Sequence, residues 1–197
     1  MIKNIIFDVG GVLFSYRWRE AMVDAGFSLE AAEEYGSNIF DDPLWQDLDR
    51  QIVPYWDKVE ELANKYAPWH DAVIEFLTNV EKMPIDRPKV WEKVAYLKKK
   101  GYKLYILSNY SEYMFSRHTK DKPFMELMDG IMVSYMIHEL KPNPPIYNAL
   151  IEKYQLNKDE CIFFDDRAEN VQGAIDVGIA ARVVKDEETL LRELDKL

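Results

Sequence analysis

Several polar residues stand directly after short apolar segments, at the points where parallel strands would end. Asp8 follows the apolar residues 5–7 and precedes Gly10 and Gly11, whose missing Cβ lets a backbone turn sharply and approach a ligand. An acid at the carboxyl end of a central strand lies where open α/β sheets bind their ligands. We therefore interpret Asp8 as a candidate nucleophile. Ser108-Asn109 and Asp165-Asp166 also end predicted strands, and Lys141 lies in a loop that follows another.

A parallel sheet would bring the carboxylates of Asp8, Asp165 and Asp166 to one edge. Two like charges about 4 Å apart repel by roughly 4 kcal/mol at an effective dielectric near 20, so such a group needs a proton or a cation. An all-oxygen site with few carboxylates suits Mg²⁺. The sequence has no cluster of His or Cys that would offer a zinc alternative.

An anionic substrate group would find several donors at the same edge. The Lys141 ammonium and the Ser108 hydroxyl are two of them, and backbone amides after Asp8, such as that of Gly11, would add more. Each motif also has an ordinary structural explanation as a Ser-Asn turn, a Lys-Pro loop or an Asp-Asp helix start. The occurrence of all four motifs in order, at successive strand ends, favours the functional interpretation.

The elements that would position these residues alternate between helix and strand after residue 88. Strands are predicted over residues 5–7, 102–107, 131–134, 161–164 and 180–184. Helices are predicted over residues 90–100, 146–154 and 170–177, with a further helical stretch leading to Gly130 and a closing helix at the end of the chain. This alternation predicts right-handed crossovers and a parallel sheet.

Residues from about 16 to 88 carry helical periodicity and no strand signal. Ser28 and Asp42 are expected N-caps, and Gly36 is expected to end a helix. Four tryptophans lie in this block, and we expect most of them in its own core: Trp18, Trp45, Trp56 and Trp69. The sequence therefore predicts an α/β, Rossmann-like parallel-sheet core of residues 1–14 and 89–197 with an inserted all-helical cap of residues 15–88.

Four motifs together resemble those of the haloacid dehalogenase-like (HAD) hydrolase superfamily. They are residues 7–13 (Phe-Asp-Val-Gly-Gly-Val-Leu), 107–109 (Leu-Ser-Asn), 141–142 (Lys-Pro) and 163–166 (Phe-Phe-Asp-Asp). The resemblance spans essentially the whole chain and implies the HAD fold with a cap of the first insertion class. The chain is similar to the branch that contains the bacterial glucose-1-phosphate phosphatase and the phosphatase domain of soluble epoxide hydrolase, where the last motif also continues to an Asn, here Asn170.

The resemblance implies a Mg²⁺-dependent phosphomonoester hydrolase of a small metabolite, with a sugar phosphate as the expected class. Asp8 would attack phosphorus and form an aspartyl-phosphate. The metal ligands would be Asp8, the Gly10 carbonyl and Asp166, with Asp165 acting through water or orienting the site. The phosphoryl oxygens would be bound by Ser108 and Asn109, and Lys141 would offset the charge on nucleophile and phosphate.

Gly10 departs from the pattern of most phosphatases of this superfamily, which carry a second Asp two positions after the nucleophile as general acid and base. General acid–base catalysis typically supplies about 10²–10⁴-fold. Its absence predicts slow turnover, a leaving group that tolerates weak protonation, or an acid delivered by the cap, with Tyr16, Arg17 and Glu20 as nearby candidates. The histidines are expected to be surface or packing residues: His70, His118 and His138.

Two other functions stay open. A 2-haloacid dehalogenase of the same superfamily also lacks the second Asp, attacks carbon and needs no metal, although it typically carries Ser and Asn where this chain has Asp165-Asp166. A catalytically weak protein that binds a phosphorylated metabolite is the non-enzyme alternative, suggested by Gly10. A receiver domain, in contrast, would place its acidic pair after the first strand. Metal dependence is the simplest way to discriminate between the phosphatase and the dehalogenase.

The composition limits the compartment and the partners. A chain of 197 residues is long enough for one core with an insertion. Its net charge of −10 argues against nucleic acid or an anionic membrane as partner, and no apolar segment approaches transmembrane length. The single cysteine, Cys161, excludes an internal disulfide and fits a reducing compartment. We expect a cytoplasmic protein that binds a small phosphorylated substrate, while the oligomeric state stays open.

Overall fold

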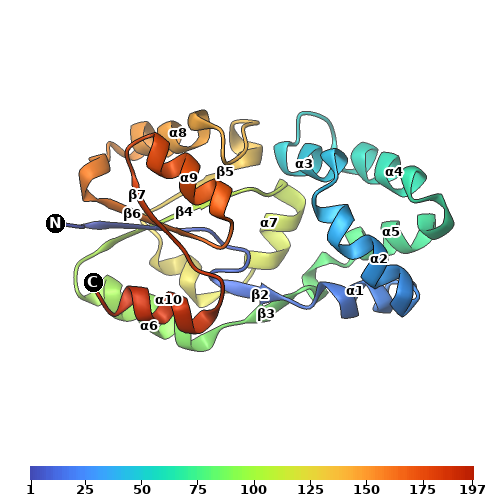
Figure 1. Cartoon of the computed structure of the whole chain (residues 1–197), viewed down its shortest axis with the longest axis horizontal. Helices are drawn as coiled ribbons and strands as arrows, with labels where there is room; N and C mark the ends of the chain where they lie inside the picture. Colours follow the sequence, from blue (N-terminus) through green and yellow to red (C-terminus); the bar gives the residue numbers. More distant parts are fainter.

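A five-stranded sheet with the strand order β5-β4-β1-β6-β7 forms the centre of the molecule (Figure 1). The structure is a computed structural model that describes residues 1–36 and 38–197. The strands are β1 (Asn4–Phe7), β4 (Lys103–Ser108), β5 (Gly130–Val133), β6 (Cys161–Asp165) and β7 (Ala180–Val183). All neighbours in this sheet pair in parallel. The predicted α/β fold with a parallel sheet is confirmed.

Alternate side chains of β1 enter two apolar cores, one on each face of the sheet. The flanking helices are α6 (Pro88–Lys99), α7 (Glu112–Thr119), α8 (Pro144–Tyr154), α9 (Ala168–Asp176) and α10 (Glu187–Leu194). Ile5 and Phe7 pack in the core that contains α6 and α10, whereas Ile6 packs in the core with α8 and α9. These helix pairs cover opposite faces of the sheet (Figure 1). Because strand side chains alternate between faces, a continuously apolar β1 requires cover on both.

The helical stretch predicted before Gly130 is shorter in the structure. It consists of α7 and a 3₁₀ turn, η3 (Pro123–Leu127), separated by Asp121 in the left-handed region at φ 57°. A non-glycine residue in that region interrupts a helix, and Pro123 then opens the new turn. The remaining 3₁₀ turns of this part of the chain are η4 (Ser134–Met136) and η5 (Lys158–Glu160).

Five helices from the first half of the chain, here called the cap helices, lie together at one end of the molecule (Figure 1). They are α1 (Trp18–Asp24), α2 (Leu29–Phe40), α3 (Pro43–Arg50), α4 (Tyr55–Lys65) and α5 (His70–Thr78), with 3₁₀ turns η1 (Ala67–Trp69) and η2 (Val80–Lys82). Ser28 accepts a hydrogen bond from the Ala31 N–H, and Asp42 accepts one from the Leu44 N–H. Both predicted N-caps are therefore correct.

Gly36 does not end a helix, as the sequence suggested, but lies inside α2, which continues to Phe40. The reason is tertiary packing. A Cβ at Gly36 would overlap the indole ring of Trp18, so the glycine allows α1 and α2 to approach each other. The ring of Trp18 in turn packs edge-on against that of Phe40.

A short two-stranded antiparallel sheet joins the cap helices to the central sheet. It consists of β2 (Phe14–Tyr16) and β3 (Pro84–Asp86), with Ser15 opposite Ile85. The prediction that residues 16–88 contain no strand is wrong for β3. Three residues that begin with proline carry no alternation to detect, and the strand exists because residues about 70 positions earlier pair with it.

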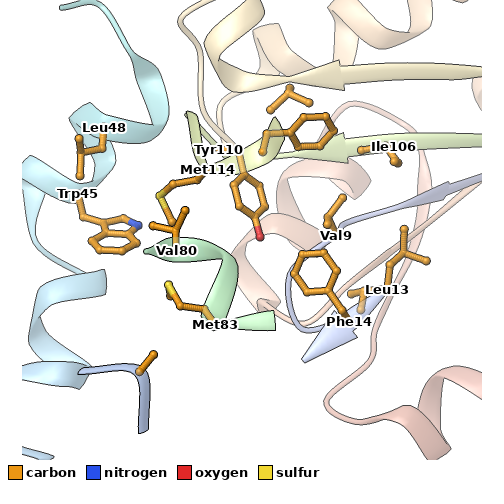
Figure 2. Packing of buried hydrophobic residues seen from close by; sticks show 14 of the residues in the cluster. Val9, Leu13, Phe14, Trp45, Leu48, Val80, Met83, Ile106, Tyr110 and Met114 are labelled. Atoms are coloured by element: carbon orange, nitrogen blue, oxygen red, sulfur yellow. The ribbon is translucent and has the colours of Figure 1, made fainter. Parts of the chain in front are cut away.

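The apolar core continues from the sheet into the cap helices. Trp45 and Leu48 of α3 face Val80 and Met83 of the returning segment, and Met114 and Tyr110 complete the contact from the core side (Figure 2). This packing holds α3 beside the segment that follows β4. No helix in the described part of the chain combines the length and the apolar character needed to cross a membrane.

Candidate active site

A cavity of about 500 Å³ lies where the cap helices meet the carboxyl ends of the strands. From the sheet side it is lined by predicted site residues: Asp8, Gly10, Ser108, Asn109, Lys141 and Asp166. From the cap side it is lined by aromatic and polar residues: Trp18, Phe40, Trp45, Gln46, Asp49 and Arg50. The volume suits a small metabolite. Of the four cap tryptophans, Trp18 and Trp45 thus reach the cavity, while Trp56 is 46% exposed.

Asp8 lies directly after β1, and its backbone N–H donates to the Phe164 carbonyl of β6. The residue is 8% exposed. The Ser108 hydroxyl donates to Asp8 Oδ1 at 2.5 Å, and Lys141 Nζ lies 2.9 Å from the same oxygen. Burial raises the pKa of Asp8 above its ordinary value, and the Lys141 ammonium opposes this effect. The structure therefore brings the predicted nucleophile, hydroxyl and ammonium into direct contact.

Asp165, at the end of β6, is fully buried and surrounded by donors. Lys141 Nζ lies 2.5 Å from its Oδ2, the Arg167 backbone N–H donates to its Oδ1 at 2.8 Å, and Asn170 Nδ2 lies 3.1 Å from both oxygens. A carboxylate held in this way is fixed in orientation. Its contacts with Lys141 and with the loop before α9 make Asp165 a part of the site's scaffold.

Lys141 bridges Asp8 and Asp165 with a side chain that is 1% exposed. Burial by itself would lower the pKa of Lys141, but the carboxylates of Asp165 and Asp8 raise it above its ordinary value. Its backbone is held by Asn109, whose Oδ1 accepts from the Lys141 N–H at 2.8 Å and whose Nδ2 donates to the Lys141 carbonyl at 3.0 Å. The peptide bond from Lys141 to Pro142 is cis. Asn109, predicted to bind phosphoryl oxygens, thus also positions the lysine.

Asp166 completes the group of acids. One carboxylate oxygen each of Asp8, Asp165 and Asp166 lie within 4.8 Å of one another. Burial first, and then the charges of Asp8 and Asp165, raise the pKa of Asp166 to about 7. Three carboxylates beside one ammonium leave a net negative charge that needs a cation, and the side chains of the cluster offer only oxygen atoms as metal ligands. This chemistry fits a hard divalent cation such as Mg²⁺.

The two glycines after Asp8 have different neighbours. Gly11 has φ 70°, and a Cβ there would overlap the Asp166 carboxylate. Its carbonyl accepts a hydrogen bond from Arg87 Nη1 at 2.5 Å. Gly10 faces the other way, because a Cβ there would lie 2.5 Å from the Tyr16 hydroxyl oxygen. The phenol of Tyr16 therefore occupies the space into which a second acid at position 10 would extend.

Tyr16 belongs to a buried chain of polar groups. Its hydroxyl is hydrogen-bonded to that of Tyr110, which lies 3.3 Å from His118 Nδ1, and His118 Nε2 lies 2.8 Å from the Val80 carbonyl oxygen. A carbonyl only accepts, so Nε2 carries a proton. Burial lowers the pKa of His118 to about 4, so the ring is neutral near pH 7 and Nδ1 accepts from Tyr110. Tyr110 must then accept the hydrogen bond of Tyr16, so the Tyr16 proton is engaged within this chain.

The other two acid candidates do not reach the cavity. Arg17 pairs with Asp24 at 3.1 Å, and Glu20 is exposed on α1. Sequence reasoning instead missed Asp49, which lines the cavity from the end of α3. Its position could have been found only from the packing of α3 on the core, because Asp49 is one of two acids on that short helix and no sequence motif distinguishes it from Asp47.

Comparison with known proteins agrees with this geometry. A family model described as haloacid dehalogenase-like hydrolase matches residues 2–178. The chain is 27% identical over 193 residues to a phosphatase of Mycobacterium tuberculosis, a match that covers 93% of this chain and 87% of the relative. It is 26% identical over 196 residues to a sesquiterpene phosphatase of Aspergillus oryzae, covering 99% and 96% of the two chains.

A solved structure with the same fold is that of a HAD family enzyme of Bacteroides thetaiotaomicron in complex with magnesium and inorganic phosphate. Its TM-score is 0.74 at 19% sequence identity, and the match covers 95% of this chain and 96% of that one. The predicted resemblance to this superfamily is confirmed, and the chain is an enzyme whose named relatives include phosphatases. It belongs to the haloacid dehalogenase-like hydrolases.

Proposed function

We propose that this chain is a Mg²⁺-dependent phosphomonoester hydrolase that acts on a small metabolite through an aspartyl-phosphate. The observation that carries the proposal is the environment of Asp8. Its carboxylate contacts a hydroxyl and an ammonium, and it lies beside two further carboxylates at the wall of a cavity of about 500 Å³. A buried nucleophile, fixed anion donors and a cation site are the elements of covalent phosphoryl transfer.

In the proposed reaction, an Asp8 oxygen attacks phosphorus while the bond from phosphorus to the leaving oxygen breaks. Water then attacks the phosphoryl group, and the electron pair of the bond between phosphorus and Asp8 returns to the carboxylate. Lys141 offsets negative charge on Asp8 and on the phosphoryl oxygens. Ser108, Asn109 and the backbone N–H of Gly11 hold the phosphoryl group by hydrogen bonds.

The residues that would hold Mg²⁺ are Asp8, Asp166 and the Gly10 carbonyl, with Asp165 behind them. Asp165 is supported in an orienting role because Lys141, Asn170 and a backbone N–H already donate to it. Asp166 is supported as a direct ligand because it lines the cavity. Bound Mg²⁺ would neutralise the carboxylates and polarise a phosphoryl oxygen.

We further propose that residues 15–88 act as a cap on a hydrolase core formed by residues 1–14 and 89–197. The antiparallel pair of β2 and β3 supports this division, since these two strands are the links between the cap helices and the central sheet. With α3 against the segment after β4, the cap would cover the bound substrate and exclude water from the reaction.

A sugar phosphate is the proposed substrate class. The cap side of the cavity combines the flat rings of Trp18 and Trp45 with the polar groups of Gln46 and Arg50. Such a mixture suits a molecule with both apolar faces and hydroxyl groups. A terpenyl phosphate, the substrate type that the name of the Aspergillus relative suggests, would instead require a predominantly apolar wall.

A substrate panel tests this function. We expect the purified chain to hydrolyse sugar phosphates with Mg²⁺, to lose this activity with a chelator and to regain it when Mg²⁺ is restored. Asp8→Asn should lower kcat/KM by at least about 10⁴-fold, the order expected when a covalent nucleophile is removed. Asp159→Asn, an exposed acid near the opposite end of β6, should leave it unchanged.

Phosphatase activity that survives both Asp8→Asn and chelation would contradict the proposal. Halide release from 2-chloropropionate without metal, in the absence of phosphatase activity, would point to the dehalogenase alternative. Binding of a phosphorylated metabolite without turnover would instead support the non-enzyme alternative.

A further inference from the structure

The described wall of the cavity contains four carboxyl groups: Asp8, Asp49, Asp166 and Glu169. Asp8 and Asp166 belong to the cluster that the proposed phosphatase reaction already uses. Glu169 lies at 2.5 Å from the guanidinium of Arg167, and its pKa is lowered by a backbone N–H at the start of α9 and by that guanidinium. It stays ionised near pH 7. Asp49 is the remaining acid, and it comes from the cap.

Three contacts fix the end of α3 on the core. The Ser134 hydroxyl donates to the Asp49 carbonyl at 2.6 Å, the Arg50 carbonyl lies 2.9 Å from His138 Nδ1, and the Glu112 N–H donates to Gln51 Oε1 at 2.7 Å. Each contact joins the cap to a segment that follows β4 or β5. The position of Asp49 is therefore set by the same strand ends that carry Ser108 and the loop before Lys141.

The Asp49 side chain is poised to hold a proton. It belongs to none of the ion pairs among the described residues. Burial raises its pKa to about 7, the Asp8 charge adds to this effect, and a hydrogen bond from the Ser111 backbone N–H opposes it. A group whose pKa lies near the working pH can both give and take a proton.

Tyr16 is the competing donor, because its hydroxyl fills the space beside Gly10. Two observations argue against it. The hydrogen-bond chain through Tyr110 to His118 already uses the Tyr16 proton. Burial also raises the pKa of Tyr16 well above its ordinary value, so its proton is held more tightly than that of a free phenol.

We propose that Asp49 is the general acid and base that replaces the acid missing at Gly10. The inference rests on the proposed phosphatase function. As Asp8 attacks phosphorus and the bond to the leaving oxygen breaks, the leaving oxygen takes the proton of Asp49. The attacking water then gives a proton to the Asp49 carboxylate while its oxygen bonds to phosphorus and Asp8 leaves. The acid is restored protonated, and the products are an alcohol and inorganic phosphate.

The test compares leaving groups that differ in their need for a proton. We expect Asp49→Asn to lower kcat/KM at least about 100-fold for glycerol phosphate, whose alkoxide must be protonated, within the range of general acid catalysis. For p-nitrophenyl phosphate, whose leaving phenolate is stable, the loss should stay below about 5-fold. Asp47→Asn changes an acid on the same helix that pairs with Arg50 and Lys58 but does not itself line the cavity, and it should show no difference between the two substrates.

The pH profile gives a second readout, measured at saturating Mg²⁺. Because the acid must be protonated, kcat/KM of the wild-type protein for glycerol phosphate should fall as the pH rises through about 7, and this limb should disappear in Asp49→Asn. The charged and titratable groups that act on Asp49 from the surrounding elements are Asp8, Lys141, Arg167, Tyr16, Tyr110 and Tyr55. All of them are retained in the variant.

An equal loss on both substrates, or a limb of the pH profile that is unchanged in Asp49→Asn, would overturn the role of Asp49.

Chemical rescue guards against a variant that is merely distorted. Added formate should restore glycerol phosphate hydrolysis to Asp49→Ala at least 5-fold more than to Asp47→Ala, and equal effects on both would count against the proposal. If the wild-type protein hydrolyses no phosphomonoester, or if Asp8→Asn retains activity, the phosphatase function itself has failed. Suppose that the wild-type protein is active and Asp8→Asn is inactive, but Asp49→Asn loses the same activity on both substrates. The phosphatase function would then stand, and only the role of Asp49 would be overturned.

Discussion

The two walls of the cavity balance the charge of their acids in different ways. On the sheet side, Asp8 and Asp165 share the ammonium of Lys141, at 2.9 and 2.5 Å. On the cap side, Asp49 has no ion pair among the described residues, and burial raises its pKa to about 7. Asp8 and Asp165 thus keep their charge beside a fixed cationic partner, whereas Asp49 has no such partner among the described residues and keeps a proton within reach. This difference suits a nucleophile on one side and a proton carrier on the other.

Replacement of Lys141 should remove the fixed cation of the sheet wall and have the largest effect on stability. Lys141→Met leaves two buried carboxylates without their cation, and breaking a buried ion pair in this way costs about 3–5 kcal/mol. We expect that decrease in the free energy of unfolding, measured by urea denaturation at pH 7, together with loss of phosphatase activity.

The matched control lies before the amino end of β1, the strand whose carboxyl end carries Asp8. Lys3 precedes β1 and pairs with Glu160 at 2.5 Å, but its side chain is 62% exposed. Lys3→Met should therefore cost about 1 kcal/mol or less. Equal losses in the two variants would mean that burial of the Lys141 pair does not set its importance.

Most of the sheet side could be predicted from the sequence, because the relevant signals are local. An apolar run followed by Asp8, or by Asp165-Asp166, marks a strand end, and a parallel sheet places such ends together. The contacts of Ser108 and Lys141 with Asp8 follow from the same rule. The orienting role of Asn109 toward Lys141 does not, because it depends on a loop conformation that no residue pattern specifies.

The cap side could be predicted only as a group of helices. N-caps at Ser28 and Asp42 are local signals, but the side of α3 that faces the sheet depends on contacts made far away in sequence, such as that between Ser134 and the Asp49 carbonyl. Gly36 was misinterpreted for the same reason, since the ring of Trp18 decides its role. Tertiary contacts, and not helical periodicity, therefore bring an acid into the cavity.

His118 tests whether burial lowers the pKa of a histidine that contacts the Val80 carbonyl of the cap segment. Its pKa is about 4 in the folded protein and ordinarily 6.5, so between these values the unfolded chain binds a proton that the folded chain does not. The free energy of unfolding should consequently fall as the pH is lowered from about 6.5 to about 4, by about 3 kcal/mol. In His118→Gln this part of the pH dependence should be missing, as measured by urea denaturation across that range.

His70 supplies a control of opposite sign. It is paired with Asp71 and Glu60, and the hydrogen bonds to these carboxylates raise its pKa. A raised histidine pKa adds stability at low pH that is lost as the pH rises above the ordinary value. His70→Gln should thus leave the acid-side loss intact. An unchanged acid-side loss in His118→Gln would show that His118 is not buried in its neutral form.

The smallest effect on stability is expected at two glycines, one beside the acid cluster and one outside the cavity wall. Gly11 and Gly101 both adopt left-handed conformations, with φ 70° and 96°. A Cβ at Gly101 would meet no heavy atom of the described chain within 4 Å, whereas a Cβ at Gly11 would overlap the Asp166 carboxylate. Gly101→Ala should therefore cost only the backbone strain, about 1–2 kcal/mol, and leave turnover unchanged.

Gly11→Ala carries the same strain, but it must also displace Asp166 from the acid cluster. We expect a similar or moderately larger loss of stability than in Gly101→Ala. We also expect kcat/KM to fall at least about 10-fold and half-maximal activity to need a higher Mg²⁺ concentration. The reason is that the displaced Asp166 carboxylate would no longer lie at the right distance from Asp8 and Asp165. Equal activity in the two variants would place Asp166 outside the working site. A loss confined to Gly11→Ala would instead show that the sheet wall depends on fixed geometry, as its paired charges suggest.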